Sequence, residues 1–293
     1  MRPQLQWDLG TRKLALGHRT LLMGIVNVTP DSFSDGGLHF DLNLDDPARA
    51  VQHALQLLDD GADIVDIGGE STRPGAAAIV SAEQELDRVL PVIQAVKRER
   101  PEVIVSVDTY KARVAQIAVE AGAQIVNDVS GGTWDAAMLP TVASLQCGFV
   151  LMHMRGRPTE WRNLPPIGDA VAVVREELAQ RAREAVTHIA ASRIVLDPGF
   201  GFGKSFEENF PLVARFESLH ALGYPLLGGV SRKSFIGRML ATEMGDAPLE
   251  DRLHGTLAIE TALVLKGAHI IRTHDVRASR DAARAADAIL QAS

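Results

Sequence analysis

The stretch from Ile194 to Phe210, IVLDPGFGFGKSFEENF, combines four features in order: an apolar run, a carboxylate, a glycine-rich loop and the start of an amphipathic segment. The apolar run ends at Asp197, and glycines alternate with other residues up to Lys204. A buried strand that ends in a polar side chain and leads through a loop into a helix is one βα unit. The number of such units in the chain therefore decides the fold.

The glycine-rich loop does not match nucleotide-binding loops. A phosphate loop G-x-x-x-x-G-K-[ST] ending at Gly203 and Lys204 would need a glycine where the chain has Pro198, which lacks the backbone N–H that such loops use. The dinucleotide pattern G-x-G-x-x-G starting at Gly199 would need its last glycine at Lys204. The function of the loop therefore has to be inferred from the other strand ends.

Short, β-branched and almost continuously apolar runs recur along the chain, as is typical of strands buried on both faces. They cover residues 21–29, 63–69, 103–109, 124–130, 148–154, 193–199, 225–231 and 269–275. An amphipathic segment follows each run. Eight strand–helix pairs in 293 residues predict an α/β fold, a TIM (β/α)8 barrel in a single domain.

Helix-boundary signals support the alternation. Pro47 and Gly61 suit the start and stop of the first helix, and Ser81 with Gln84 forms a capping-box pattern before the second. Further amphipathic segments predict helices over 111–121, 135–145, 169–190, 206–221, 250–266 and 277–291. Residues 1–20 are expected to be an N-terminal lead-in, a small hairpin that closes the bottom of the barrel, and 21–293 the barrel domain.

Composition excludes several classes of protein. With 46% hydrophobic and 23% charged residues the chain is typical of a globular protein. A net charge of −7 and the absence of a dense basic run argue against a nucleic-acid partner. The chain has no apolar run of the ~18 residues needed to span a membrane and no apolar signal core, which predicts a cytoplasmic protein. The single cysteine, Cys147, excludes an internal disulfide, and its apolar neighbours predict buried packing.

Every predicted strand ends in polar side chains, and reactive residues of such barrels lie at these ends. Any one of them could be a helix cap or a turn residue, but eight ends that converge on one barrel mouth favour a binding site. They are Asn27; Glu70, with Thr72 and Arg73; Asp108; Asn127 and Asp128; His153; Asp197; Ser231, Arg232 and Lys233; and Arg272 with His274.

The residue types divide into an acidic and a basic group. A carboxylate accepts two parallel N–H bonds, so Asp108, Asn127 and Asp197 suit the 2-amino-pyrimidinone edge of a guanine or a pterin. Lys233 is a compact cation that can bond ring oxygens and nitrogens. The cationic cluster of Arg73, Arg272 and His274 suits phosphate; taken alone, a surface salt-bridge network is the alternative.

Three long segments leave the predicted strand ends: residues 30–46, 70–82 and 232–251. Long glycine- and serine-rich loops on the reactive face of a barrel are typical of lids that exclude water. Surface insertion without a role is the alternative.

Eight motifs together resemble those of dihydropteroate synthase, in the order of that family and over roughly residues 20 to 290. They are MGIVNVTPDSFSDGG, DIGGESTRPGA, VSVDT, IVNDVSGG, LMHM, LDPGFGFGK, SRKSFIG and IIRTHDV. The resemblance implies an enzyme of folate biosynthesis, a transferase that joins 6-hydroxymethyl-7,8-dihydropterin diphosphate to 4-aminobenzoate and releases pyrophosphate. It also implies a homodimer, which the sequence itself does not show.

The resemblance also implies roles for individual residues. Asp108, Asn127, Asp197 and Lys233 would hold the pterin, with Asp108, Lys233 and Arg272 as the catalytic group. The rest of the substrate site, with the diphosphate, would involve Asn27, Thr72, Arg73, Arg272, Thr273 and His274. Asn27 would also bind the cofactor Mg²⁺. Phe33, Pro74 and Ser234 would complete the 4-aminobenzoate site, which sulfonamide inhibitors occupy in the family.

Two positions depart from the usual family pattern, and two other functions compete. Tyr110 stands where a small serine is common, and Thr273 replaces a common valine. Lys204 is expected to be a loop lysine and not a phosphate ligand. The rivals are a corrinoid methyltransferase that binds methyltetrahydrofolate and a non-catalytic pterin-binding homologue. The former lacks the SRKS segment and the NVTPDSFSDGG lid in this form, and the latter should have lost the anion-site residues.

Overall fold

The computed structural model describes residues 2–29, 47–71 and 80–292 and confirms the barrel. The parallel strands are β3 (Leu21–Asn27), β4 (Ile64–Gly68), β5 (Ile104–Asp108), β6 (Ile125–Asp128), β7 (Gly148–Met152), β8 (Ile194–Asp197), β9 (Leu227–Gly228) and β10 (Ile270–Thr273). They form one eight-stranded sheet in the order β8-β7-β6-β5-β4-β3-β10-β9. A parallel bridge between Leu196 and Leu226 joins its two edges, so the sheet closes on itself.

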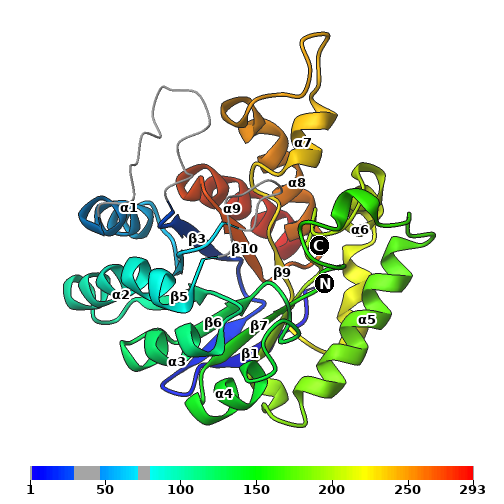
Figure 1. The fold of residues 1–293 in the computed structure, drawn as a ribbon. Helices are drawn as coiled ribbons and strands as arrows, with labels where there is room; N and C mark the ends of the chain where they lie inside the picture. The colour runs from blue at the N-terminus through cyan, green and yellow to red at the C-terminus, as the bar shows by residue number, and fades with distance from the viewer. Residues whose placement is uncertain (1, 30–46, 72–79, 293) are drawn as a thin grey trace.

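Helices surround the strands on the outside (Figure 1). The α-helices are α1 (Pro47–Asp59), α2 (Ala82–Glu99), α3 (Ala112–Glu120), α4 (Met138–Leu145), α5 (Ala170–Ala185), α6 (Phe206–Ala214), α7 (Ser234–Met239), α8 (Leu253–Leu265) and α9 (Val276–Ala292). Short 3₁₀ turns are η2 (Trp161–Asn163), η3 (Ala191–Arg193), η4 (Phe216–Leu222) and η5 (Leu249–Arg252). Ser81 and Gln84 form the predicted capping box at α2, with hydrogen bonds of 3.0 and 3.2 Å.

The structure corrects the expectation for residues 232–251, because this segment contains α7 and η5. Helix α7 has six residues, too few to show a helical period in the sequence. The helix expected over 206–221 is divided into α6 and η4. The segment 30–46 and most of the segment 70–82 lie outside the described residues.

The expected N-terminal hairpin is present as β1 (Leu5–Asp8) paired antiparallel with β2 (Lys13–Leu16). Trp7 is fully buried and packs in one cluster with the first residues of the barrel strands. The Trp7 indole donates to the Arg193 carbonyl at 2.8 Å. A Cβ on Gly148, at the start of β7, would lie 2.5 Å from Leu9 Cδ2, so glycine permits this close approach. The hairpin covers the amino-terminal end of the barrel; the boundary at residue 20 stays a prediction.

The apolar core lies mainly between the strands and the helices. Cys147 belongs to it, with 2% of its surface exposed, and burial raises the pKa of its thiol to about 11. The predicted packing role of this cysteine is therefore confirmed. No helix among the described residues has the length and apolarity that crossing a bilayer requires. The carboxyl ends of the strands carry polar side chains instead, among them Asn27, Asp108 and Asp197.

Candidate active site

A cavity of about 510 Å³ lies where the carboxyl ends of the strands converge. Its lining includes eight of the residues expected from the sequence: Asn27, Asp108, Asn127, Asp197, Lys233, Ser234, Arg272 and His274. Thr72, Arg73, Pro74 and Phe33 lie outside the described residues. The barrel geometry thus brings together side chains that are up to 247 positions apart, from Asn27 to His274.

The glycine loop fixes the carboxylate of Asp197. The Gly199 amide donates to Asp197 Oδ1 at 2.7 Å. Gly199 has φ of +64°, and a Cβ there would lie 2.0 Å from the His153 carbonyl oxygen, so other residues are excluded. Burial raises the pKa of Asp197, while the nearby Lys233 charge opposes the shift. Asp197 is also part of the cavity lining.

Lys233 stands beside this carboxylate on the cavity wall. Its ammonium donates to the Phe200 carbonyl and lies 4.2 Å from the centre of the Phe202 ring. Burial lowers the pKa of Lys233 to about 7, and the Asp197 charge opposes the shift. The amine can therefore hold or lose its proton near neutral pH.

Arg272 is held by two carboxylates. Its Nε donates to Asp66 Oδ2 at 2.6 Å and its Nη2 to Asp108 Oδ2 at 2.7 Å. Asn127 Nδ2 donates to the same Asp66 oxygen at 2.9 Å. Burial raises the pKa of Asp108 to about 7, with the Arg272 charge opposing. The acidic and basic groups predicted as separate ends of the site are thus connected.

Asp66 lies in the middle of β4, is fully buried and is not among the residues predicted from the strand ends. Its sequence signal is a carboxylate inside the apolar run DIVDIGG. Charged residues are almost never fully buried unless they are paired, so this position could have been identified as the partner of a cation.

His274 and Thr273 differ in direction because successive strand residues face opposite sides. His274 Nδ1 lies 3.0 Å from Ser231 Oγ, and His274 lines the cavity. The Thr273 hydroxyl is fully buried and lies 2.9 Å from Ser279 Oγ in α9. Thr273, expected among the substrate residues, therefore points to the helix layer. Arg232 forms a two-pronged ion pair with Asp275, at 2.8 and 2.6 Å.

Three other polar residues of this face support the walls. Lys204 Nζ bonds the Gly199 carbonyl at 2.7 Å and His153 Nδ1 at 2.9 Å. His153 is fully buried, its Nε2 lies 2.9 Å from Glu177, and burial lowers its pKa to about 3. Asp128 accepts from the amides of Ser130 and Gly132 at 2.7 and 2.8 Å. Lys204 is a loop lysine, as predicted, but a buried one that ties the glycine loop to β7.

Comparison with known proteins identifies the family. The chain matches the family described as pterin binding enzyme over residues 23–274. It is 42% identical to dihydropteroate synthase of Clostridium beijerinckii, covering 97% of this chain and 99% of the relative. It is 45% identical to the Escherichia coli K12 enzyme, covering 92% of each. The chain belongs to the dihydropteroate synthase family.

Solved structures of dihydropteroate synthases agree with this assignment. The Xanthomonas albilineans enzyme with 4-aminobenzoic acid superposes with a TM-score of 0.85 at 42% identity, covering 98% of this chain and 99% of that one. The Yersinia pestis enzyme with a sulfonamide drug complex gives a TM-score of 0.88 at 39% identity, covering 99% and 100%. The predicted activity, a dihydropteroate synthase of the transferase class, is confirmed over the methyltransferase alternative.

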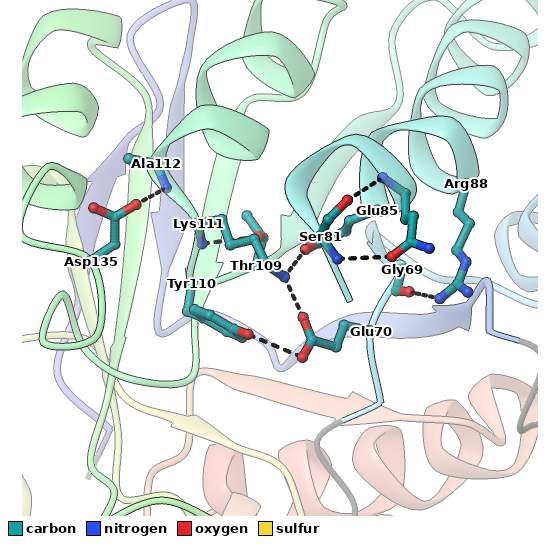
Figure 2. A network of polar contacts seen from close by, with 11 residues as sticks. Gly69, Glu70, Ser81, Glu85, Arg88, Thr109, Tyr110, Lys111, Ala112 and Asp135 are labelled. Atoms are coloured by element: carbon teal, nitrogen blue, oxygen red, sulfur yellow. Dashed lines mark hydrogen bonds and ion pairs between the residues drawn. The ribbon is translucent and has the colours of Figure 1, made fainter. Parts of the chain in front are cut away.

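Tyr110, the departure from the usual pattern of the dihydropteroate synthase family, is part of a polar network at the rim (Figure 2). Its hydroxyl donates to Glu70 Oε1 at 3.0 Å. Lys111 bonds both Glu70 and Glu85. Glu70 lines the cavity and lies two residues after the end of β4. The larger side chain thus acts as an anchor for this strand end.

Proposed function

We propose that this cavity condenses 6-hydroxymethyl-7,8-dihydropterin diphosphate with 4-aminobenzoate to give 7,8-dihydropteroate and pyrophosphate. One observation carries the proposal: a buried acceptor group, Asp197 with Asn127, shares a single cavity with Arg272 and His274. The substrate has the matching polarity, a donor edge on the pterin and an anionic diphosphate. Structures of the Xanthomonas albilineans enzyme with 4-aminobenzoic acid and with 7,8-dihydropteroate support the choice of substrate.

In this proposal Asp197 accepts the 2-amino and N3 hydrogens of the pterin. Burial raises the pKa of Asp197, and a ligand that supplies two further N–H groups would stabilise the ionised carboxylate. Asn127 and Lys233 bond the other ring nitrogens and the ring oxygen. Met152 and Phe200 supply apolar surface on the same cavity wall.

The reaction develops negative charge on the departing pyrophosphate and positive charge on the pterin methylene. Arg272 and His274 bind the former, and an ionised Asp108, bonded to Arg272, favours the latter electrostatically. Asp108, Lys233 and Arg272 are therefore the proposed catalytic residues. The aromatic amine is already a nucleophile, so the step needs no strong general base.

The donor set fits a magnesium ion held mainly by substrate. Within the described residues no cluster of three or more His, Cys, Asp or Glu side chains could hold a metal ion. Mg²⁺ commonly uses one or two protein oxygens with phosphates and waters, and Asn27 offers an amide oxygen to the cavity. When bound, the ion would add Lewis-acid stabilisation of the phosphate charge.

The 4-aminobenzoate lies, in this proposal, near Ser234; Phe33 and Pro74, the other two residues predicted for this part of the site, lie outside the described residues. Ser234 lines the cavity at the start of α7. Arg252 and Phe202 line the same part and suit a carboxylate and an aromatic ring. The Yersinia pestis structure with a sulfonamide drug complex supports sulfonamides as inhibitors that compete for this place.

The homodimer and the cytoplasmic location are also proposals. Helix α8 is buried on the barrel side through Ile259 and Leu263, yet its outer side carries Ala258, Ala262 and Leu265, with Leu265 38% exposed. A helix that is apolar on both sides favours a second covering surface, here a second copy of the chain. Sedimentation of the wild-type protein as a monomer at micromolar concentration would contradict this.

Asp197→Asn tests the pterin site. The amide turns an N–H toward the ring donors, so binding of 6-hydroxymethylpterin should weaken at least about 100-fold, the loss expected for a charged hydrogen-bond pair. Asp169→Asn is the control, because it makes the same change at the N-cap of α5, where the side chain is half exposed. Calorimetry that gives the wild-type affinity for Asp197→Asn would refute the assignment.

A further inference from the structure

The interior of β4 holds a carboxylate that the proposed substrate contacts do not use. Asp66 is fully buried and does not belong to the described lining of the cavity. Its Oδ2 atom nevertheless accepts from Asn127 at 2.9 Å and from Arg272 at 2.6 Å. Asn127 lies two strands away on one side, in β6, and Arg272 two strands away on the other, in β10. A single oxygen therefore connects three strands, β6, β4 and β10, across the two strands that lie between them.

The first consequence concerns the amide of Asn127. Asp66 Oδ2 acts as an acceptor for Arg272 Nε as well, so it requires the Nδ2 end of Asn127 to face it. A flipped amide would place two acceptor oxygens in contact. With Nδ2 fixed, Oδ1 is directed away from Asp66, and Asn127 meets a ligand as a defined acceptor. Asp66 thus sets the hydrogen-bond polarity of a residue on the cavity wall.

The second consequence concerns the guanidinium of Arg272. Asp66 binds Nε and Asp108 binds Nη2, so two carboxylates fix the orientation of its plane. Within the described residues these bonds leave the Nη1 group for an anion, since a guanidinium has five N–H donors. Without Asp66 the side chain would keep only the bond to Asp108 and could rotate about it.

We propose that Asp66 is a positioning residue that serves both halves of the substrate site at once, through the amide of Asn127 and the guanidinium of Arg272. The inference rests on the proposed function, in which Asn127 meets the pterin and Arg272 the diphosphate. A substitution of Asp66 should therefore weaken the binding of both the pterin and the diphosphate. A residue that contacts only one part of the substrate site cannot have this effect.

The test uses 6-hydroxymethylpterin and inorganic pyrophosphate with Mg²⁺ as separate probes, measured by calorimetry on the full chain. Asp66→Asn keeps the shape and can still present one oxygen to both donors, but it removes the negative charge of the acceptor. Both affinities should fall by about tenfold or more, the loss expected for a hydrogen bond to a charged group. Asn127→Ala should weaken only the pterin probe. In the Asn127→Ala background, Asp66→Asn should weaken pterin binding by less than it does alone, since both changes remove one contact.

Ser106→Ala is the matched control. Ser106 lies directly opposite Asp66 in β5 and is equally buried, but its hydroxyl has no hydrogen-bond partner within the described residues. This variant should bind both probes as the wild-type protein does. If Asp66→Asn bound both probes normally, lost only one, or showed full additivity with Asn127→Ala, the inference would be overturned.

A second variant covers the case in which Asp66→Asn does not fold. Asn127→Asp places two carboxylates face to face, and such pairs share a proton with a raised pKa. The protonated oxygen can then donate to Asp66. Lys233 and Asp108 also titrate in this site, so the readout is the pterin affinity of the Asn127→Asp variant relative to wild type at each pH, and this ratio should rise as pH falls. A ratio that does not change with pH would overturn the inference. Wild-type protein that binds neither probe would refute the proposed function itself, and the inference with it.

Discussion

Lys204 provides a quantitative test of how the glycine loop is held. Its Nζ bonds the Gly199 carbonyl at 2.7 Å, His153 Nδ1 at 2.9 Å and the Phe202 carbonyl at 3.2 Å. Burial also lowers the pKa of Lys204 well below its usual value. Lys204→Met keeps the length of the side chain but removes these bonds. Each buried acceptor left without a donor costs ~1–3 kcal/mol. Methionine offsets part of this cost because its burial carries no desolvation penalty of an amine. We therefore expect the free energy of unfolding to fall by about 3 kcal/mol.

The loss should appear in stability and in pterin binding together. For a chain of this size it corresponds to a fall in Tm of about 6 °C, which differential scanning calorimetry measures directly. Because the Gly199 amide also holds Asp197, the affinity for 6-hydroxymethylpterin should fall in the same variant. Lys266→Met is the control, since Lys266 is 40% exposed and bound to Glu217 at the surface. A Lys204→Met protein with the Tm and pterin affinity of the wild-type protein would show that this lysine does not support the loop.

Two further predictions concern Glu260 in α8 and His274 on the cavity wall. Glu260 is 2% exposed, and burial raises its pKa to about 7. The folded protein therefore binds a proton at this carboxylate more tightly than the unfolded chain does. As a result, stability falls as pH rises from about 4 to 7. Glu260→Gln removes this dependence. In urea unfolding, the stability of the variant relative to wild type should rise by about 3 kcal/mol between pH 4 and pH 8. A difference that stays constant with pH would contradict the raised pKa of Glu260. His274→Ala should weaken pyrophosphate binding about tenfold and leave 6-hydroxymethylpterin binding unchanged; equal loss of both would refute a separate anion site.

Much of the architecture could be predicted because barrel strands are buried on both faces and therefore leave apolar runs in the sequence. Polar residues at the ends of these runs, such as Asn27 and Asp197, meet because the barrel brings all strand ends to one mouth. Alternation along a strand could also have been used further: with Arg272 and His274 facing inward, Thr273 between them has to face the helices.

Other features depend on contacts between distant parts of the chain. Asp66 reaches Asn127 and Arg272 across intervening strands, and sequence patterns show neither contact. Lys204 follows three alternating glycines, which is typical of an exposed loop, but the structure buries it against His153. Helix α7 is too short for its period to be recognised. Tertiary packing decides each of these cases.

The central claim is that the cavity couples pterin recognition to pyrophosphate release. The measurement that tests it most directly is pyrophosphate release from 6-hydroxymethyl-7,8-dihydropterin diphosphate with Mg²⁺, with and without 4-aminobenzoate. Release should require 4-aminobenzoate, and an equal amount of 7,8-dihydropteroate should form. Tight pterin binding without turnover, or release that does not depend on 4-aminobenzoate, would contradict it.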